Sequence, residues 1–113
     1  MALALIFSAA VTPKDFHLSA KKNGSDYFLN LYTANNPNIY DTTPILLNTW
    51  YMVGFTLKNN GDLIFYVNGT ASSTHSSVSR TNSSIAHFII GDARHKLGIV
   101  GNIGELKFYN RVL

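Results

Sequence analysis

The feature that most constrains the fold is a pair of alternating apolar segments separated by a short polar turn. The first is Trp50-Tyr-Met-Val-Gly-Phe-Thr-Leu-Lys58 and the second is Asp62-Leu-Ile-Phe-Tyr-Val-Asn68, with Asn59-Asn60-Gly61 between them. Apolar side chains at every second position are typical of β-strands, and an Asn-Gly pair can adopt the positive φ angles of a type I′ turn. The sequence therefore predicts an antiparallel β-hairpin over residues 50–68.

Both faces of the predicted hairpin carry apolar side chains. The face expected to lie in the core comprises Tyr51, Val53, Phe55, Leu57, Leu63, Phe65 and Val67. The opposite face comprises Trp50, Met52, Thr56, Ile64, Tyr66 and Asn68. A partly apolar second face needs a cover, which a second sheet, a neighbouring subunit or a ligand can provide. A two-layer β-sandwich is the simplest of these arrangements.

The rest of the chain repeats the strand pattern, and no window shows a convincing 3.6-residue apolar period. We expect further strands at residues 3–9, 16–20, 27–33, 85–90 and 103–109. A turn is expected at Asn35-Asn36-Pro37-Asn38, and a long loop over the Ser- and Thr-rich residues 70–84. The prediction is a single all-β domain over residues 1–113, folded as an antiparallel two-sheet β-sandwich.

Composition limits the classes of protein to which the chain can belong. Apolar residues make up 46% of the 113 residues and charged residues 13%, so a core can form and disorder is not expected. The absence of cysteine excludes disulfides and thiolate metal sites. The first ten residues lack the positive segment and the apolar length of a signal peptide, and no stretch approaches the roughly 20 apolar residues of a membrane span. We therefore expect no membrane insertion.

The net charge of +3 does not indicate a nucleic-acid partner. The nine Lys and Arg are spread thinly, with one adjacent pair at Lys21-Lys22 and one short cluster at Arg94-His95-Lys96. Binding to a phosphate backbone leaves a broader basic stripe than either of these. No nucleic acid is expected as a partner.

Several blocks of the sequence are similar to one known family. Residues 47–55 (LNTWYMVGF) and 63–69 (LIFYVNG) resemble the Trp-bearing strand and the following strand, which ends in Tyr-Val-Asn-Gly, of laminin-G-like modules. Residues 88–92 and then 101–113 (GNIGELKFYNRVL) resemble the closing block of the same modules. The chain is similar to the laminin-G-like, concanavalin A-like lectin/glucanase jelly rolls, of which it represents roughly the C-terminal two-thirds.

The resemblance implies a double-sheet jelly roll that recognises glycans or protein partners, at an extracellular or virion surface. It also implies that Trp50 lies in the core and that Glu105, beside the final strand, is structural. Gly61 is expected to be structural as a glycine of the hairpin turn. Fold alone does not determine function, because the same architecture serves many activities.

The sequence lacks the residues of the enzyme classes that this fold could support. Glycoside hydrolysis needs two carboxylates, but Glu105 is the only glutamate, and the Glu-x-Asp-x-x-Glu cluster that the resemblance would imply for a glucanase is absent. The serine hydrolase motif Gly-x-Ser-x-Gly is absent, and the four histidines lack the paired spacing of a zinc site. No enzymatic activity is expected unless another chain supplies carboxylates.

Calcium is the one cofactor that the sequence leaves open. Calcium takes oxygen ligands from loops, and the resemblance implies a site at the rim in some family members. Asp92 and Asn102 are the candidate ligands, with Asp26 and Asp41 as further acidic positions. Capping of ordinary turns is the alternative explanation for each.

Glycan sites typically combine an aromatic platform with amides and charged groups. The candidate contacts are Tyr40, Tyr66, Asn68, Asp92 and Arg94. They are expected on or near loops 34–44, 70–84 and 91–97 at one edge of the sandwich, although aromatic residues in strands more often belong to the core.

Two functions follow from these observations. The first is a non-catalytic recognition module that binds a glycan or a glycosylated surface in adhesion or attachment. The second is a structural subunit of a fibre, coat or other assembly, which uses its two-sided apolar strands for contact with further copies. An open sheet edge favours assembly, and a rim site lined by Tyr and Asp favours binding.

Overall fold

The computed structural model describes residues 7–9, 16–33, 36–58, 60–78, 88–90 and 102–107 of the chain. These residues form eight strands, which are β1 (Phe7–Ala9), β2 (Phe16–Asn23), β3 (Asp26–Thr33), β4 (Asn36–Tyr40), β5 (Val53–Leu57), β6 (Leu63–Val67), β7 (Thr70–His75) and β8 (Phe88–Ile90). The described part of the chain contains no helix long and apolar enough to cross a membrane.

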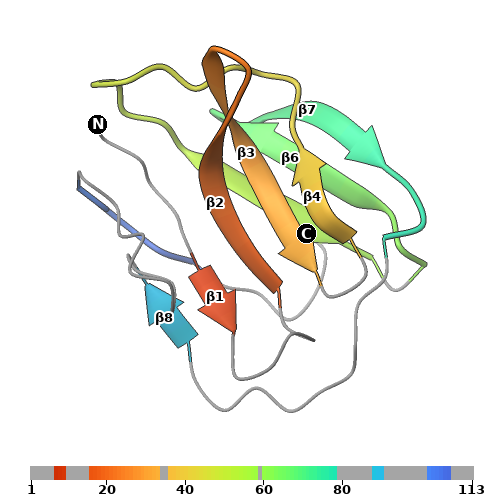
Figure 1. Ribbon diagram of the computed structural model, residues 1–113. Coiled ribbons are helices and arrows are strands. Elements are labelled where there is room, and N and C mark those ends of the chain that lie inside the picture. The colour runs from red at the N-terminus through yellow and green to blue at the C-terminus, as the bar shows by residue number, and fades with distance from the viewer. Residues whose placement is uncertain are drawn as a thin grey trace.

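The strands form two antiparallel sheets. The larger sheet has the strand order β4-β3-β2-β1-β8 and the smaller one the order β5-β6-β7. Figure 1 shows β2, β3 and β4 lying in front of β6 and β7, so that the sheets form two layers. The prediction of an all-β, two-sheet antiparallel fold is confirmed.

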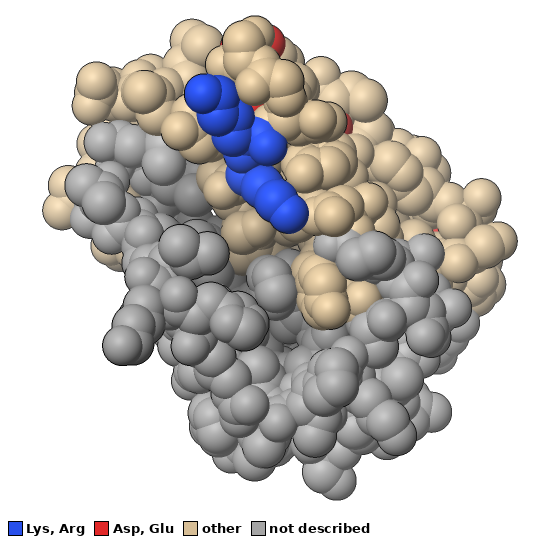
Figure 2. All heavy atoms as spheres, in the orientation of Figure 1, with Lys and Arg blue, Asp and Glu red and all other residues tan. Residues whose placement is uncertain are grey.

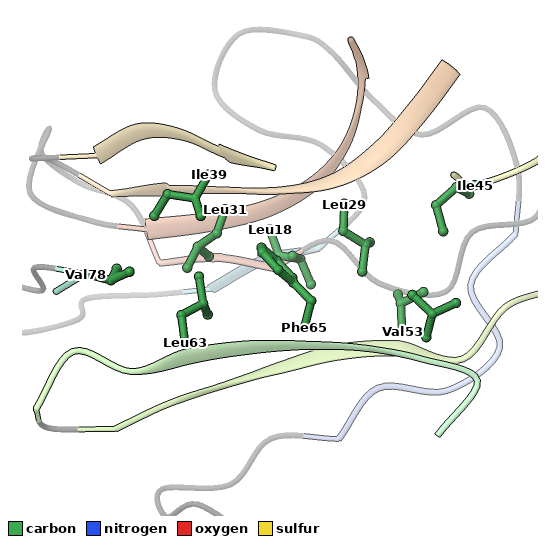
Figure 3. Packing of buried hydrophobic residues seen from close by; sticks show 10 residues of the cluster. Leu18, Leu29, Leu31, Ile39, Ile45, Val53, Leu63, Phe65 and Val78 are labelled. Carbon is green, nitrogen blue, oxygen red and sulfur yellow. The ribbon is translucent and has the colours of Figure 1, made fainter. Parts of the chain in front are cut away.

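The hydrophobic core lies between the two sheets. Leu18 and Leu31 are paired across β2 and β3 and are both fully buried, and Phe65 of β6 is fully buried opposite them. Figure 3 shows the side chains of the two layers pointing toward one another in this space. The buried cluster comprises Leu18, Leu29, Leu31, Ile39, Ile45, Val53, Leu63, Phe65, Val67 and Val78.

The predicted hairpin is present, and its core face is the one expected. β5 and β6 pair from Val53 opposite Val67 to Leu57 opposite Leu63. Val53, Leu63, Phe65 and Val67 are buried, and Tyr51, Phe55 and Leu57 pack against them. Strict alternation fixes this face, because a shift of one residue would turn every core side chain outward.

The turn that joins β5 and β6 differs from the expected type I′ turn. Its left-handed residue is Gly61, with φ 93°, and Asn60 instead accepts a hydrogen bond from the Asp62 amide through its side chain, at 3.0 Å. The Lys58 amide donates to the Asp62 carbonyl at 3.0 Å. Lys58 and Asp62 are therefore paired at the base of the turn, and the three positions between them are the next most common length of a hairpin connection.

Two strands lie where the sequence predicted a turn and a loop. Residues 36–40 form β4, an edge strand of the larger sheet, where a proline such as Pro37 is tolerated. Residues 70–75 form β7, the edge strand of the smaller sheet. Asn68 and Gly69, with φ 53° and 80°, make the two-residue turn that joins β6 to β7, so the second Asn-Gly pair has the type I′ signature expected of the first.

Three further expectations are corrected or only partly tested. Residues 103–107 form no strand, while 108–109 lie outside the described residues. β1 and β8 agree with the ends of predicted strands 3–9 and 85–90, whose remaining residues are not described. The expectation that Trp50 lies in the core is wrong, because 59% of its surface is exposed.

Candidate functional site

A cluster of exposed apolar side chains lies on the segment that leads into β5. Leu46 is 60% exposed, Leu47 54%, Trp50 59% and Met52 66%. Large apolar side chains are single on most surfaces, so four of them within seven positions mark a candidate binding surface. We call these four residues the Trp50 surface.

Local hydrogen bonds hold this segment in place. The backbone turns at Asn48, which has a φ of 54°, a left-handed conformation that asparagine tolerates. The Leu46 amide donates to the hydroxyl of Tyr51 at 3.1 Å, and the Thr49 hydroxyl donates to the Leu47 carbonyl at 3.1 Å. The Tyr51 ring packs against the core, so Tyr51 anchors the segment while its neighbours Trp50 and Met52 remain exposed.

Asn68 ties the turn between β6 and β7 to the Trp50 surface. The backbone amide of Asn68 donates to the Met52 carbonyl at 2.6 Å, and the side-chain Oδ1 of Asn68 accepts from the backbone amide of Met52 at 3.0 Å. Because Oδ1 is used in this way, the group that the exposed Asn68 side chain can offer a ligand is the Nδ2 donor.

Tyr66 extends this surface along the outer face of the smaller sheet. It lies opposite Gly54 on β5, and both residues alternate with the buried Val53, Phe65 and Val67. A Cβ atom placed on Gly54 would meet no atom within 4 Å. The position beside the half-buried Tyr66 ring is therefore open on the side away from the core.

Residues 102–107 lie beside the indole of Trp50. A Cβ atom on Gly104 would lie 3.6 Å from Cζ3 of Trp50. Asn102 and Glu105 are both exposed on this segment, and Glu105 pairs with Lys107 at 3.5 Å. An ion pair this exposed contributes little to stability. The approach of Gly104 to the indole is what places this segment beside Trp50.

The structure brings some of the predicted glycan contacts together and separates others. Tyr66 and Asn68 lie next to the Trp50 surface. Tyr40 lies on β4 of the other sheet, paired with Asn30 and half buried. Asp92, Arg94 and the whole of loop 91–97 lie outside the described residues. Trp50 was expected in the core because the family resemblance implies it, whereas the alternation had placed Trp50 on the opposite face of the hairpin.

A second cluster of polar side chains joins the edges of the two sheets. Asp41 follows β4 and is only 3% exposed; its Oδ1 accepts a hydrogen bond from the Ser73 hydroxyl of β7 at 2.6 Å. The hydroxyls of Thr43 and Ser72 are hydrogen-bonded next to this pair. We call these four residues the edge seam.

A β-bulge in β7 makes this seam possible. Thr74 pairs with Ile64 and Ala71 pairs with Tyr66, so two residues of β7, Ser72 and Ser73, lie opposite Phe65 alone. An extra residue reverses the alternation at that point. Both serines consequently face the larger sheet, one toward Thr43 and the other toward Asp41.

With the neighbouring His75, the edge seam brings Asp, Ser and His side chains together, but not in a catalytic order. The Ser73 hydroxyl donates its hydrogen bond to Asp41. The Ser73 oxygen also lies 3.2 Å from Nε2 of His75, and because its hydrogen is already used, Nε2 is the donor in this second bond. A nucleophilic serine needs the reverse arrangement, in which histidine accepts the serine proton and the carboxylate orients the histidine. This geometry ties the sheets together and does not activate Ser73.

The described residues do not assemble a metal site of the expected kind. No group of three or more His, Asp or Glu side chains lies close enough among them to hold an ion. Asn102 is exposed, and Asp92 is outside the described range. The calcium site expected at Asp92 and Asn102 therefore stays a prediction.

Three of the four described lysines, Lys21, Lys22 and Lys58, lie away from the Trp50 surface. Figure 2 shows lysine side chains over β2, on the face of the larger sheet turned toward the viewer. Nζ of Lys21 reaches across to Oδ1 of Asn38 on β4, at 2.8 Å. Among the described residues, these lysines form only a short basic patch.

The comparison with protein families agrees with this two-sheet architecture. The family model Laminin_G_3, described as the concanavalin A-like lectin/glucanases superfamily, matches residues 3–113. The chain belongs to this family. Comparison with curated proteins and with solved structures gave no significant match.

Membership in the laminin G-like family confirms the resemblance seen in the Trp-bearing and closing blocks. The family match covers nearly the whole chain, and thus extends well beyond the blocks on which the resemblance was based. Laminin G-like domains are generally non-catalytic. Their fold leaves the ligand open, so the function of this chain has to be argued from its own surface.

Proposed function

We propose that this laminin G-like domain is a non-catalytic recognition module that binds carbohydrate at the Trp50 surface. The observation that carries the proposal is the 59% exposure of Trp50, the only tryptophan of the chain. An exposed indole costs free energy in water, since burying a large apolar side chain is worth about 1.5–3 kcal/mol. A ligand that covers the ring recovers part of that free energy.

The groups around the indole suit a sugar ring. One face of a pyranose presents C–H groups that can stack on an aromatic ring, and its edges present hydroxyls that need hydrogen-bond partners. Asn68 and Asn102 are exposed beside Met52 and Gly104, respectively. An apolar platform with a few amides at its border is the composition of a small-ligand site.

The proposal places the domain where glycans are displayed, at an extracellular or virion surface. Its partner is a glycan or a glycoprotein, and the domain acts in attachment. No residue of the Trp50 surface is assigned a chemical role beyond contact.

The second candidate function is that of a structural subunit in an assembly. Leu46, Leu47 and Met52 favour it, because three exposed aliphatic side chains beside an indole are also typical of a protein interface. In that case the Trp50 surface would be buried against another subunit and not against a sugar.

A glycan-array screen combined with a measurement of oligomeric mass separates the two functions. Carbohydrate binding predicts selective signals that Trp50→Ala abolishes while the mass stays that of a monomer. Assembly predicts a stable oligomer that Trp50→Ala and Leu47→Ser dissociate, with no glycan signal. Lys21→Ala is the matched control, since Lys21 is exposed on the other sheet, and it should change neither result.

A further inference from the structure

The border of the platform is aliphatic to an unusual degree for a sugar site. Leu47 precedes Trp50 across the turn at Asn48, and Met52 follows Trp50 by two residues. All three side chains are more than half exposed. A hexose that carries only hydroxyls would bring polar groups against Leu47 and Met52, and these hydroxyls would lose water without gaining a partner.

A methyl group on the sugar removes this conflict. The methyl carbon of a 6-deoxyhexose, or that of an acetamido group, can lie against the aliphatic side chains while the ring lies on the indole. The Nδ2 donor of Asn68 is held near this border by the two hydrogen bonds between Asn68 and Met52. It can donate to a hydroxyl or to the carbonyl oxygen of an acetamido group.

The charges of the described residues favour an uncharged sugar. Lys21 and Lys22 lie on β2 of the other sheet, and Lys58 lies at the far end of β5 from Met52. On the segment that holds Gly104, Glu105 and Lys107 pair with each other at 3.5 Å. Among the described residues, no unpaired basic side chain is placed at the Trp50 surface to bind a uronate or a sulfate.

We propose that the Trp50 surface selects uncharged sugars that carry a methyl group, either a 6-deoxyhexose or an N-acetylhexosamine. This inference rests on the proposed carbohydrate-binding function and adds the chemical class of the ligand. Leu47 and Met52 supply the selectivity, and Trp50 supplies the platform.

The test compares sugars that differ by one group, by titration calorimetry on the intact chain. The pairs are 6-deoxygalactose against galactose and N-acetylglucosamine against N-formylglucosamine, with glucuronic acid as the charged probe. The methyl-bearing member of at least one pair should bind at least about fourfold more tightly, the ratio expected for burying one more methyl group. The pair that shows the preference identifies the source of the methyl group.

Variants then locate the preference. Leu47→Ser and Met52→Ser should each lower the affinity for the methyl-bearing sugar by a larger factor than the affinity for its unmethylated partner, and Lys21→Ala should leave this ratio unchanged. A far-UV circular dichroism spectrum of each variant checks that it is folded. Equal binding within both pairs, or tighter binding of glucuronic acid, overturns this inference and leaves the proposed function standing. If none of the sugars tested here or on the array binds, both fall together.

Discussion

The carboxylate of Asp41 accepts a hydrogen bond from the hydroxyl of Ser73, at 2.6 Å, and so joins the edge of one sheet to the edge of the other. Asp41 is almost completely buried, and its other oxygen, Oδ2, has no partner among the described residues. The Ser73 hydroxyl is the one donor to this buried carboxylate among the described residues. Its removal would leave both oxygens of Asp41 without a described donor. Ser73→Ala should therefore lower the free energy of unfolding by about 1.5–3 kcal/mol, as measured by urea denaturation.

Ser76→Ala provides the control for this prediction, since Ser76 is exposed just after β7 and should change the free energy of unfolding by at most about 0.5 kcal/mol. The double variant Asp41→Ala/Ser73→Ala should be destabilised by less than the sum of the single variants, because both remove the same bond. Strict additivity would show that Asp41 and Ser73 do not interact.

Gly61 combines two constraints that a side chain would violate. Its φ is 93°, and a Cβ atom would lie 3.0 Å from the backbone nitrogen of Val78, whose amide donates to the Gly61 carbonyl at 2.9 Å. Gly61→Ala should cost about 1–3 kcal/mol of stability through backbone strain and displacement of Val78.

Gly24→Ala separates those two constraints in the same denaturation measurement. Gly24 has a φ of 70°, but a Cβ atom there would meet nothing within 4 Å. Gly24→Ala should therefore lower the free energy of unfolding only by the cost of placing alanine in the left-handed conformation. If the two variants are equally destabilised, the contact of Gly61 with Val78 contributes nothing.

Asn68 supports both a turn and the Trp50 surface. Asn68→Ala puts alanine, which disfavours positive φ, at a position whose φ is 53°. It also removes the acceptor for the Met52 amide. The expected loss is about 1–2 kcal/mol. Asn68→Gly tolerates the φ angle but lacks the acceptor, so its thermal denaturation midpoint should lie between those of Asn68→Ala and the parent chain. A midpoint for Asn68→Gly below that of Asn68→Ala would contradict the importance of the turn conformation.

Gly54 offers a way to block the site without damaging the fold. The open space above it lies beside Tyr66 on the outer face of β5 and β6. Gly54→Val should keep or slightly raise stability, because valine suits a strand better than glycine does. The valine side chain should weaken sugar binding at least about tenfold by occupying the position next to the Tyr66 ring. Unchanged affinity, measured by calorimetry with the best ligand from the array, would show that the ligand does not extend over Gly54.

The parts of the fold that depend on local pattern could be predicted from the sequence. The hairpin over residues 50–68 has both strict alternation and an Asn-Gly turn, and its core face follows directly from the alternation. The family resemblance rested on the same local blocks and is confirmed by the family match. These features need no knowledge of what lies across the sandwich.

The features that depend on distant partners could not be predicted. The serine- and threonine-rich β7 resembles a loop in sequence, yet its hydroxyls meet Asp41 and Thr43 from about thirty positions earlier in the chain. Likewise, the alternation places Trp50 and Met52 on the second face of the hairpin, but only the packing of the sheets shows that they stay exposed there. Of the candidate site, Tyr66 and Asn68 were anticipated, whereas the platform itself was not.

The most direct test of the account is a fluorescence titration of the intact chain with the glycans that the array selects. Trp50 is the only tryptophan, so any tryptophan signal comes from the proposed platform itself. A bound sugar should shift the emission to shorter wavelength as it removes water from the indole, with saturation at the affinity that calorimetry gives. A glycan that binds by calorimetry while the Trp50 emission stays unchanged would contradict a site at the Trp50 surface.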